Sequence, residues 1–206
     1  MSDYPALSNG GEITTTGGSS GKKKFKITMN APVTLVFTGL CLIATILIIL
    51  FGDPMLVVFS CYRASLLSPL TYLRFFTHAL GHSGWAHFVG NMAYILLLGP
   101  LLEEKYGSAC MIEIIGLTAL ATGLINFIFF PDIAILGASG VVFAFILLSS
   151  ITSFKKGEIP ITFILVAIIY LGGQIYDGMF ANDNISNMSH IIGGIVGAFC
   201  GFFLKD

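Results

Sequence analysis

Residues 32–52 read PVTLVFTGLCLIATILIILFG, a run without one charged side chain. A bilayer has a hydrocarbon core about 30 Å thick, and a helix that rises 1.5 Å per residue needs about 20 apolar residues to cross it. The run therefore predicts a membrane-spanning helix. A cleavable signal peptide carries its apolar stretch near the start of the chain. Because 31 residues come before this run, we expect an uncleaved first span.

The rest of the chain has the same apolar character. Hydrophobic residues make up 55% of the 206 residues and charged residues only 10%, whereas a soluble domain carries roughly a quarter charged residues. We therefore expect an all-α membrane protein, a bundle of six transmembrane helices that forms one domain over residues 32–206. The predicted spans lie near 32–52, 85–102, 108–130, 140–154, 159–180 and 187–204.

Positive charges in short loops predict the orientation of the bundle. Residues 1–31 are rich in Gly, Ser and Thr, and we interpret them as a flexible tail with a basic flank. Eight of the ten basic residues fall on one side of the six spans, namely Lys22, Lys23, Lys24, Lys26, Lys105, Lys155, Lys156 and Lys205. Both termini are thus predicted to be cytoplasmic. Arg63 and Arg74 fall in the outer segment 53–84, which we expect to lie in the membrane interface with both arginines as headgroup anchors.

Charge and cysteine content exclude several kinds of partner. A net charge of −1 and the absence of a large basic block exclude nucleic acid. The four cysteines are scattered without metal-binding spacing, so we expect neither a disulfide framework nor a zinc site. No cofactor is expected. Three histidines, His78, His82 and His87, leave metal ligation as an alternative, but no HExxH motif or nearby carboxylate completes a site.

Polar residues inside the spans gather at one depth. The depth of each polar residue is counted from the charged residue that ends its predicted span on the cytoplasmic side, at about 1.5 Å per residue. On this scale the polar positions lie about 24, 22, 24 and 18 Å above the inner interface for Ser139, His190, His87 and Asn91. Three helices thus place polar groups in one layer just below the outer edge of the membrane, where such residues indicate function.

The fourth span is too short to cross the membrane. Only about 14 apolar residues separate Ser139 from Lys155, against about 20 for a full crossing. We therefore expect its outer end to be recessed and residues 130–136 to dip inward as irregular backbone. Such backbone is tolerated at depth only beside protein or a water-filled cavity. We therefore expect a cavity above Ser139.

Ser139 and His190 lie in local sequences that permit acyl-transfer chemistry. Gly137-Ala138-Ser139-Gly140 places the serine at a helix N-terminus, where free N–H groups stabilise negative charge. Glycines follow His190 at intervals that let another helix approach closely, and Gly140 and Ala144 offer small partners for Gly193, Gly194, Gly197 and Gly201. Taken alone, these glycines can serve packing and His190 can be an ordinary core residue.

His87 and Asn91 share one helical face of the second predicted span, which also contains His82 in the pattern His82-x4-His87-x3-Asn91. Both side chains can donate an N–H to a developing oxyanion. The alternative for Asn91 is a hydrogen bond between helices.

These motifs resemble those of the rhomboid family of intramembrane serine proteases. The resemblance extends over roughly residues 32–205 and includes the segments Leu73–His78 and Glu103–Gly107. It implies that Ser139 is the nucleophile and His190 its general base, without an acidic third member. It also implies that the oxyanion and the substrate are bound by His87, Asn91, Gly137 and Ala138. The residues that would support the site are Phe143, Gly140, Gly193, Gly197 and His82.

The chain departs from the family pattern at two positions. Phe143 stands where the family often has a tyrosine that packs on the catalytic histidine, so stacking is expected without a phenol hydrogen bond. Leu73 stands where a tryptophan often precedes the arginine of the outer loop. An acidic group that orients His190 is a further possibility, since Asp132, Asp177 and Asp183 lie toward the outer face.

The resemblance implies a multi-pass protease of the cell membrane, of prokaryotic plasma-membrane type, that cleaves single-span membrane proteins near their outer boundary. Two alternatives remain at this level. One is a non-catalytic rhomboid-like protein that binds membrane clients, although such proteins usually lack the serine or the histidine. The other is a small transporter lined by Glu113, Asn126 and Gln174, which the absence of an internal repeat disfavours.

Overall fold

The structure, a computed structural model, describes residues 29–151, 159–180 and 184–203, and within these every side chain except those of 174–180 and 184–186. These ranges form eight α-helices and contain no β-strand, only an isolated bridge between Cys61 and Ile135. The helices are α1 (Pro32–Phe51), α2 (Asp53–Phe59), α3 (Pro69–Thr77), α4 (Trp85–Tyr106), α5 (Ser108–Phe129), α6 (Ser139–Ile151), α7 (Ile161–Phe180) and α8 (Asn184–Phe203).

The all-helical membrane fold predicted from the sequence is confirmed. Three helices, α1, α4 and α5, are long and apolar enough to cross a bilayer, with mean hydropathies of 2.8, 1.4 and 1.9. Helix α6 and the parts of α7 and α8 whose side chains are described, Ile161–Gly173 and Asn187–Phe203, form shorter apolar segments at the positions of the last three predicted spans. Six spans and cytoplasmic termini stay predictions, because residues 1–28, 152–158 and 204–206, with seven of the eight lysines, lie outside the described residues.

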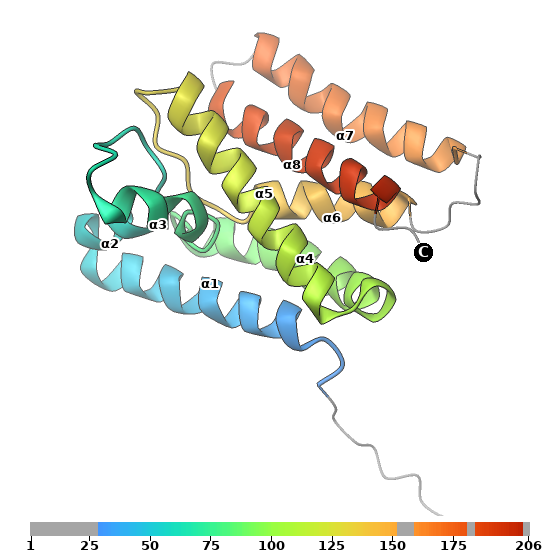
Figure 1. The fold of residues 1–206 in the computed structure, drawn as a ribbon, viewed down its shortest axis with the longest axis horizontal. Coiled ribbons are helices and arrows are strands. Elements are labelled where there is room, and N and C mark those ends of the chain that lie inside the picture. Colours follow the sequence, from blue (N-terminus) through green and yellow to red (C-terminus); the bar gives the residue numbers. More distant parts are fainter. Residues whose placement is uncertain (1–28, 152–158, 181–183, 204–206) are drawn as a thin grey trace, which may run out of the picture.

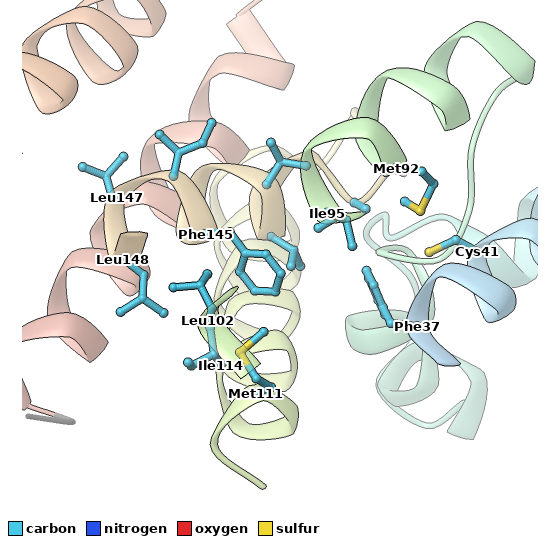
Figure 2. Packing of buried hydrophobic residues seen from close by; sticks show 14 of the residues in the cluster. Phe37, Cys41, Met92, Ile95, Leu102, Met111, Ile114, Phe145, Leu147 and Leu148 are labelled. Carbon is cyan, nitrogen blue, oxygen red and sulfur yellow. The ribbon is translucent and has the colours of Figure 1, made fainter. Parts of the chain in front are cut away.

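Helix α6 is the centre of the bundle. It packs against α4, α5, α7 and α8, and nine of its 13 residues are buried. In Figure 1 it lies between α8 and the α4–α5 pair, with α1 and α7 toward opposite edges. Figure 2 shows the Phe145 side chain of α6 next to Leu102 of α4 and Ile114 of α5. Any residue at the start of α6 is therefore held from several sides.

Glycines of α8 bring its backbone against that of α6. A Cβ atom at Gly193 would collide with the backbone of Gly140, and one at Gly197 would collide with the backbone of Ala144. The close approach predicted for these residues is confirmed. Gly194 serves a different neighbour, since a Cβ there would lie 2.5 Å from Cδ2 of Leu171 on α7. The α6–α8 spacing thus depends on residues that have no side chain.

A buried carboxylate ties α1, α4 and α5 together at one end of the bundle. Glu103 of α4 accepts hydrogen bonds at 2.9 Å from the backbone N–H groups of Val33 and Thr34, which open α1. It also accepts from the hydroxyls of Thr34 and of Ser108, the first residue of α5. The first N–H groups of a helix lack partners within the helix, and its dipole favours a negative charge there. Glu103 therefore caps α1.

Arg74 connects separate parts of the outer segment 53–84 to one another. Arg74 is only 5% exposed; its Nε donates to the carbonyl of Val57 at 2.5 Å, and its guanidinium lies 4.3 Å from the ring centre of Tyr62. The prediction of a headgroup anchor is therefore wrong for Arg74, because its charge is used inside the protein. Arg63 is exposed, and its headgroup role stays a prediction.

Replacing Gly197 by alanine should destabilise the bundle. The new methyl group overlaps backbone rather than a flexible side chain, and overpacking of this kind costs about 1–3 kcal/mol. The matched control is Gly116→Ala on α5, where a Cβ meets nothing within 4 Å and helix propensity predicts a gain of up to about 1 kcal/mol. Thermal unfolding of both variants in the same detergent tests this. Equal melting temperatures would contradict the proposed backbone contact.

Candidate active site

Ser139 opens α6 from a loop that the protein holds in place. The preceding segment crosses the interior as irregular backbone, in which Ile135 and Cys61 exchange two backbone hydrogen bonds of 2.9 Å. Gly137 has a φ of +129°, which disfavours any other residue, and its N–H donates to the carbonyl of His78 at 2.8 Å. Backbone polar groups in this loop are thus paired by the protein.

A cavity of about 220 Å³ lies at the start of α6. Ser139, His87 and Leu136 line it together with His78, Thr122 and Ser189. The cavity beside Ser139, predicted from the length of the fourth span, is confirmed, whereas the depth of the helix start in the membrane stays a prediction. The sequence did not single out Thr122 or Ser189, because a threonine or serine in an apolar helix usually bonds to its own backbone and carries no pattern.

His87 and Asn91 face the backbone just before Ser139. A Cβ at Gly137 would lie 2.8 Å from Nε2 of His87 and 3.8 Å from Nδ2 of Asn91. The other ring nitrogen of His87, Nδ1, is 3.3 Å from the hydroxyl of Ser83. Asn91 is 8% exposed, and its Nδ2 has no hydrogen-bond partner among the described residues. A buried N–H donor without an acceptor is rare in folded proteins.

His82 lies before α4, not in it, because the helix begins at Trp85. The prediction that His82 belongs to the span is therefore wrong, yet its ring reaches the same loop. Its Nε2 accepts from the N–H of Ala138 at 3.5 Å, so Nδ1 carries the proton and donates to the carbonyl of Leu80 at 3.1 Å. Burial, and to a smaller extent the neighbouring His87, lower the pKa of His82 to about 4. A neutral His82 thus supports the residue before Ser139.

His190 reaches the start of α6 from α8. Its ring is stacked on Phe143, with centroids 4.3 Å apart and planes 3° apart, as expected for Phe143 from the resemblance. The pairs Gly140–Gly193 and Ala144–Gly197 share one offset along the two helices. His190, three residues before Gly193, is therefore level with the loop that leads into Ser139. The carbonyl of Ser189 supports this placement, since it lies 3.5 Å from a Cβ built at Gly140.

The cavity at the start of α6 brings together His87, Gly137, Ser139 and Gly140 of the predicted set, and His190 follows Ser189, which also lines it. Gly197 lies farther along, opposite Ala144. No acidic side chain joins them among the residues described: Asp132 is exposed on its loop, and the side chains of Asp177 and Asp183 lie outside the described set. A metal site has no counterpart in residues 29–151, 159–180 and 184–203, where no three His, Cys, Asp or Glu side chains are grouped to hold an ion.

Comparison with known proteins decides the family. A model of the rhomboid domain matches residues 69–206, about two thirds of the chain. The chain belongs to the rhomboid family. It is therefore a membrane-embedded helical protein, as its apolar helices also indicate. The match begins at α3, so α1 and α2 stand outside it.

Named relatives of this rhomboid include proteases from bacteria. Rhomboid protease GlpG of Haemophilus influenzae is 24% identical over 174 residues, which cover 82% of this chain and 89% of the relative. Rhomboid protease GluP of Bacillus subtilis is 31% identical over 70% of this chain, and Rhomboid-related protein 1 of Caenorhabditis elegans is 30% identical over 63% of it. The matches to these two span only 28% and 39% of the relatives' own lengths.

Asn126, one of the three polar residues on which the transporter alternative depends, has a structural role in this rhomboid. Asn126 is buried, and its Nδ2 donates to the carbonyls of Cys61 and Ile133 at 3.1 and 3.0 Å. The amide joins α5 to two loops and does not line a path. Glu113 is exposed on α5, and the side chain of Gln174 lies outside the described residues.

The stability of this rhomboid should fall as the pH falls from about 6.5 to about 4. Burial lowers the pKa of both His78 and His82 from 6.5 to about 4. Protonation therefore favours the unfolded state, so their contribution is complete above pH 6.5 and is lost as the pH approaches 4. Each group contributes up to about 1.4 kcal/mol per pH unit in this window. Unfolding measured in detergent between pH 4 and 8 checks this; a flat profile would contradict it.

Proposed function

We propose that this rhomboid is an intramembrane serine endopeptidase that cleaves single-span membrane proteins within or near the outer part of their transmembrane helix. The observation that carries the proposal is the unpartnered Nδ2 of Asn91, which lies with Nε2 of His87 against the backbone that precedes Ser139. Two donors aimed at the entrance of a helix are what a developing oxyanion needs. Relatives named rhomboid proteases support the same class of reaction.

The chemistry follows from the groups at this helix N-terminus. His190 takes the proton of the Ser139 hydroxyl as the oxygen attacks the scissile carbonyl carbon. The negative charge on the carbonyl oxygen is stabilised by the N–H groups of Ser139, His87 and Asn91. His190 then returns the proton to the leaving amine, and an ester to Ser139 remains. Water from the cavity hydrolyses this ester by the same route. No metal or cofactor is invoked.

The surroundings proposed for this reaction follow from the same layer of polar residues. The domain of residues 32–206 would cross the membrane six times, with both termini in the cytoplasm and the cavity open toward the outside. The protein would lie in the cell membrane, of prokaryotic plasma-membrane type, with residues 1–31 as a cytoplasmic tail. Substrates would be single-span proteins that enter from the lipid bilayer.

The decisive experiment compares the purified protein with Ser139→Ala and His190→Ala in liposomes that contain a model single-span substrate. Wild type should cleave the substrate and react with a fluorophosphonate, and both variants should lose both activities, because each removes one member of the dyad. The melting temperature of Ser139→Ala should stay within a few degrees of wild type, since Ser139 borders a cavity, and thermal unfolding of both variants shows that they are folded when they are tested.

The matched control is Ser150→Ala, on the same helix, whose hydroxyl donates only to the carbonyl of Leu147 among the bonds described. It should cleave and be labelled like wild type. Neither cleavage nor labelling in a folded wild type would overturn the proposal and favour a protein that binds membrane clients without cutting them.

Asn91 and Asn126 form a matched pair that separates catalysis from stability. Asn91→Ala should lower kcat about 100- to 1000-fold, as loss of one oxyanion donor does, without loss of stability, because its Nδ2 has no partner in the described residues. Asn126→Ala should cost roughly 1–3 kcal/mol of stability, because it leaves two buried carbonyls without a donor. Cleavage kinetics and thermal unfolding of both variants check this. A strongly destabilised Asn91→Ala with normal kcat would reverse the assignment.

A further inference from the structure

Helix α7 is held on one side only. It packs against α6 and α8 and, within the described residues, against no other helix, and Figure 1 shows it at the edge of the bundle beside α8. One stripe of α7 contacts the core, namely Phe163, Val166, Ala167, Tyr170 and Leu171. The opposite stripe is 44–71% exposed and consists of Ile161, Ile164, Leu165, Ile168 and Ile169.

Among the α7 side chains that the structure describes, Tyr170 contacts the aromatic ring of Phe143 that packs on His190. Its ring meets Phe143 edge to face, with centroids 5.9 Å apart and planes at 80°. Phe143 in turn lies parallel to the ring of His190 at 4.3 Å. Three aromatic rings from α7, α6 and α8 therefore form one continuous stack that ends at the proposed general base.

The position of Tyr170 along α7 is fixed by its neighbour. Leu171 occupies the space that a side chain at Gly194 would take, since a Cβ there would lie 2.5 Å from Cδ2 of Leu171. Gly194 is one turn after His190 on α8. The notch at Gly194 thus sets the height of Tyr170 relative to His190.

The contact with Tyr170 is important because Phe143 can contact its neighbours only through its ring. It has no hydroxyl with which to anchor itself or His190, so its orientation depends on the rings that contact it. Edge-to-face and parallel contacts each favour one relative geometry. A general base works only when its lone pair points at the proton that it removes.

We propose that Tyr170 is a positioning residue that holds Phe143 against His190, so that the place of α7 on the α6–α8 pair sets the reactivity of Ser139. The proposal rests on the function proposed above. It makes a prediction opposite to that of an α7 that merely obstructs entry. Removing an obstruction speeds the reaction of a small probe, whereas removing a support of the general base slows it.

The test measures the rate at which a small fluorophosphonate labels Ser139 in detergent, where no substrate helix has to enter. Tyr170→Ala should be labelled at least tenfold more slowly than wild type. Tyr170→Phe should stay within twofold, because the ring that contacts Phe143 is kept. For cleavage of a transmembrane substrate, the loss in Tyr170→Ala should appear in kcat more than in KM.

Phe163→Ala is the matched control. Phe163 meets Phe202 of α8 edge to face, with centroids 5.9 Å apart and planes at 88°, so it makes the same kind of contact from α7 without reaching His190. It should lower the melting temperature as much as Tyr170→Ala and keep labelling within twofold of wild type. If both variants lose labelling rate in proportion to their loss of melting temperature, the proposal is overturned.

The remaining outcomes separate the two proposals. Labelling of wild type and Tyr170→Ala at equal rates, or faster labelling of the variant, would overturn the role of Tyr170 alone. A wild type that is not labelled would overturn the protease proposal and this one with it. If Tyr170→Ala does not fold, Tyr170→Leu keeps part of the apolar volume without the ring, and at least threefold slower labelling is expected. An unchanged rate would overturn the proposal.

Discussion

The contact between the backbones of α6 and α8 is the constraint on which the rest of the structure depends. It exists because Gly193 and Gly197 present no side chain toward Gly140 and Ala144. Lipid tails are as apolar as the helices, so close packing and hydrogen bonds hold such a bundle together, without a hydrophobic drive between its helices. The same contact brings His190 level with the start of α6. The packing of α6 against α8 therefore determines both the arrangement of the bundle and the geometry of the candidate site.

Buried polar groups of the bundle differ in whether the protein supplies their hydrogen-bond partners. Glu103 and Asn126 have their hydrogen bonds supplied by helix ends and loops. Asn91 is also buried, yet its Nδ2, like Oγ1 of Thr38, has no hydrogen-bond partner among the described residues. An unpartnered buried donor is costly to fold, which is why we interpret it as prepared for a charge that appears only during reaction.

Apolar length and polar depth made much of this structure predictable. The uncharged run at 32–52, the short fourth span and the layer of Ser139, His87 and His190 depend on spacing along single helices, which periodicity reports directly. These features led to the helical membrane fold, with which the family match agrees, and to the cavity beside Ser139. The predicted start of the second span, residue 85, coincides with the start of α4, whereas His82, which its spacing to His87 had grouped with that span, lies before the helix.

Spacing along single helices therefore showed which residues are apolar and which share one helical face, and it predicted a common depth for the polar groups. Only the tertiary structure decided which of them meet. That Arg74 is buried on Tyr62, that Ala138 donates to His82, and that Tyr170 reaches His190 through Phe143 are contacts between elements far apart in the chain. Periodicity fixes the face of one helix, whereas the partner of that face depends on how the helices cross.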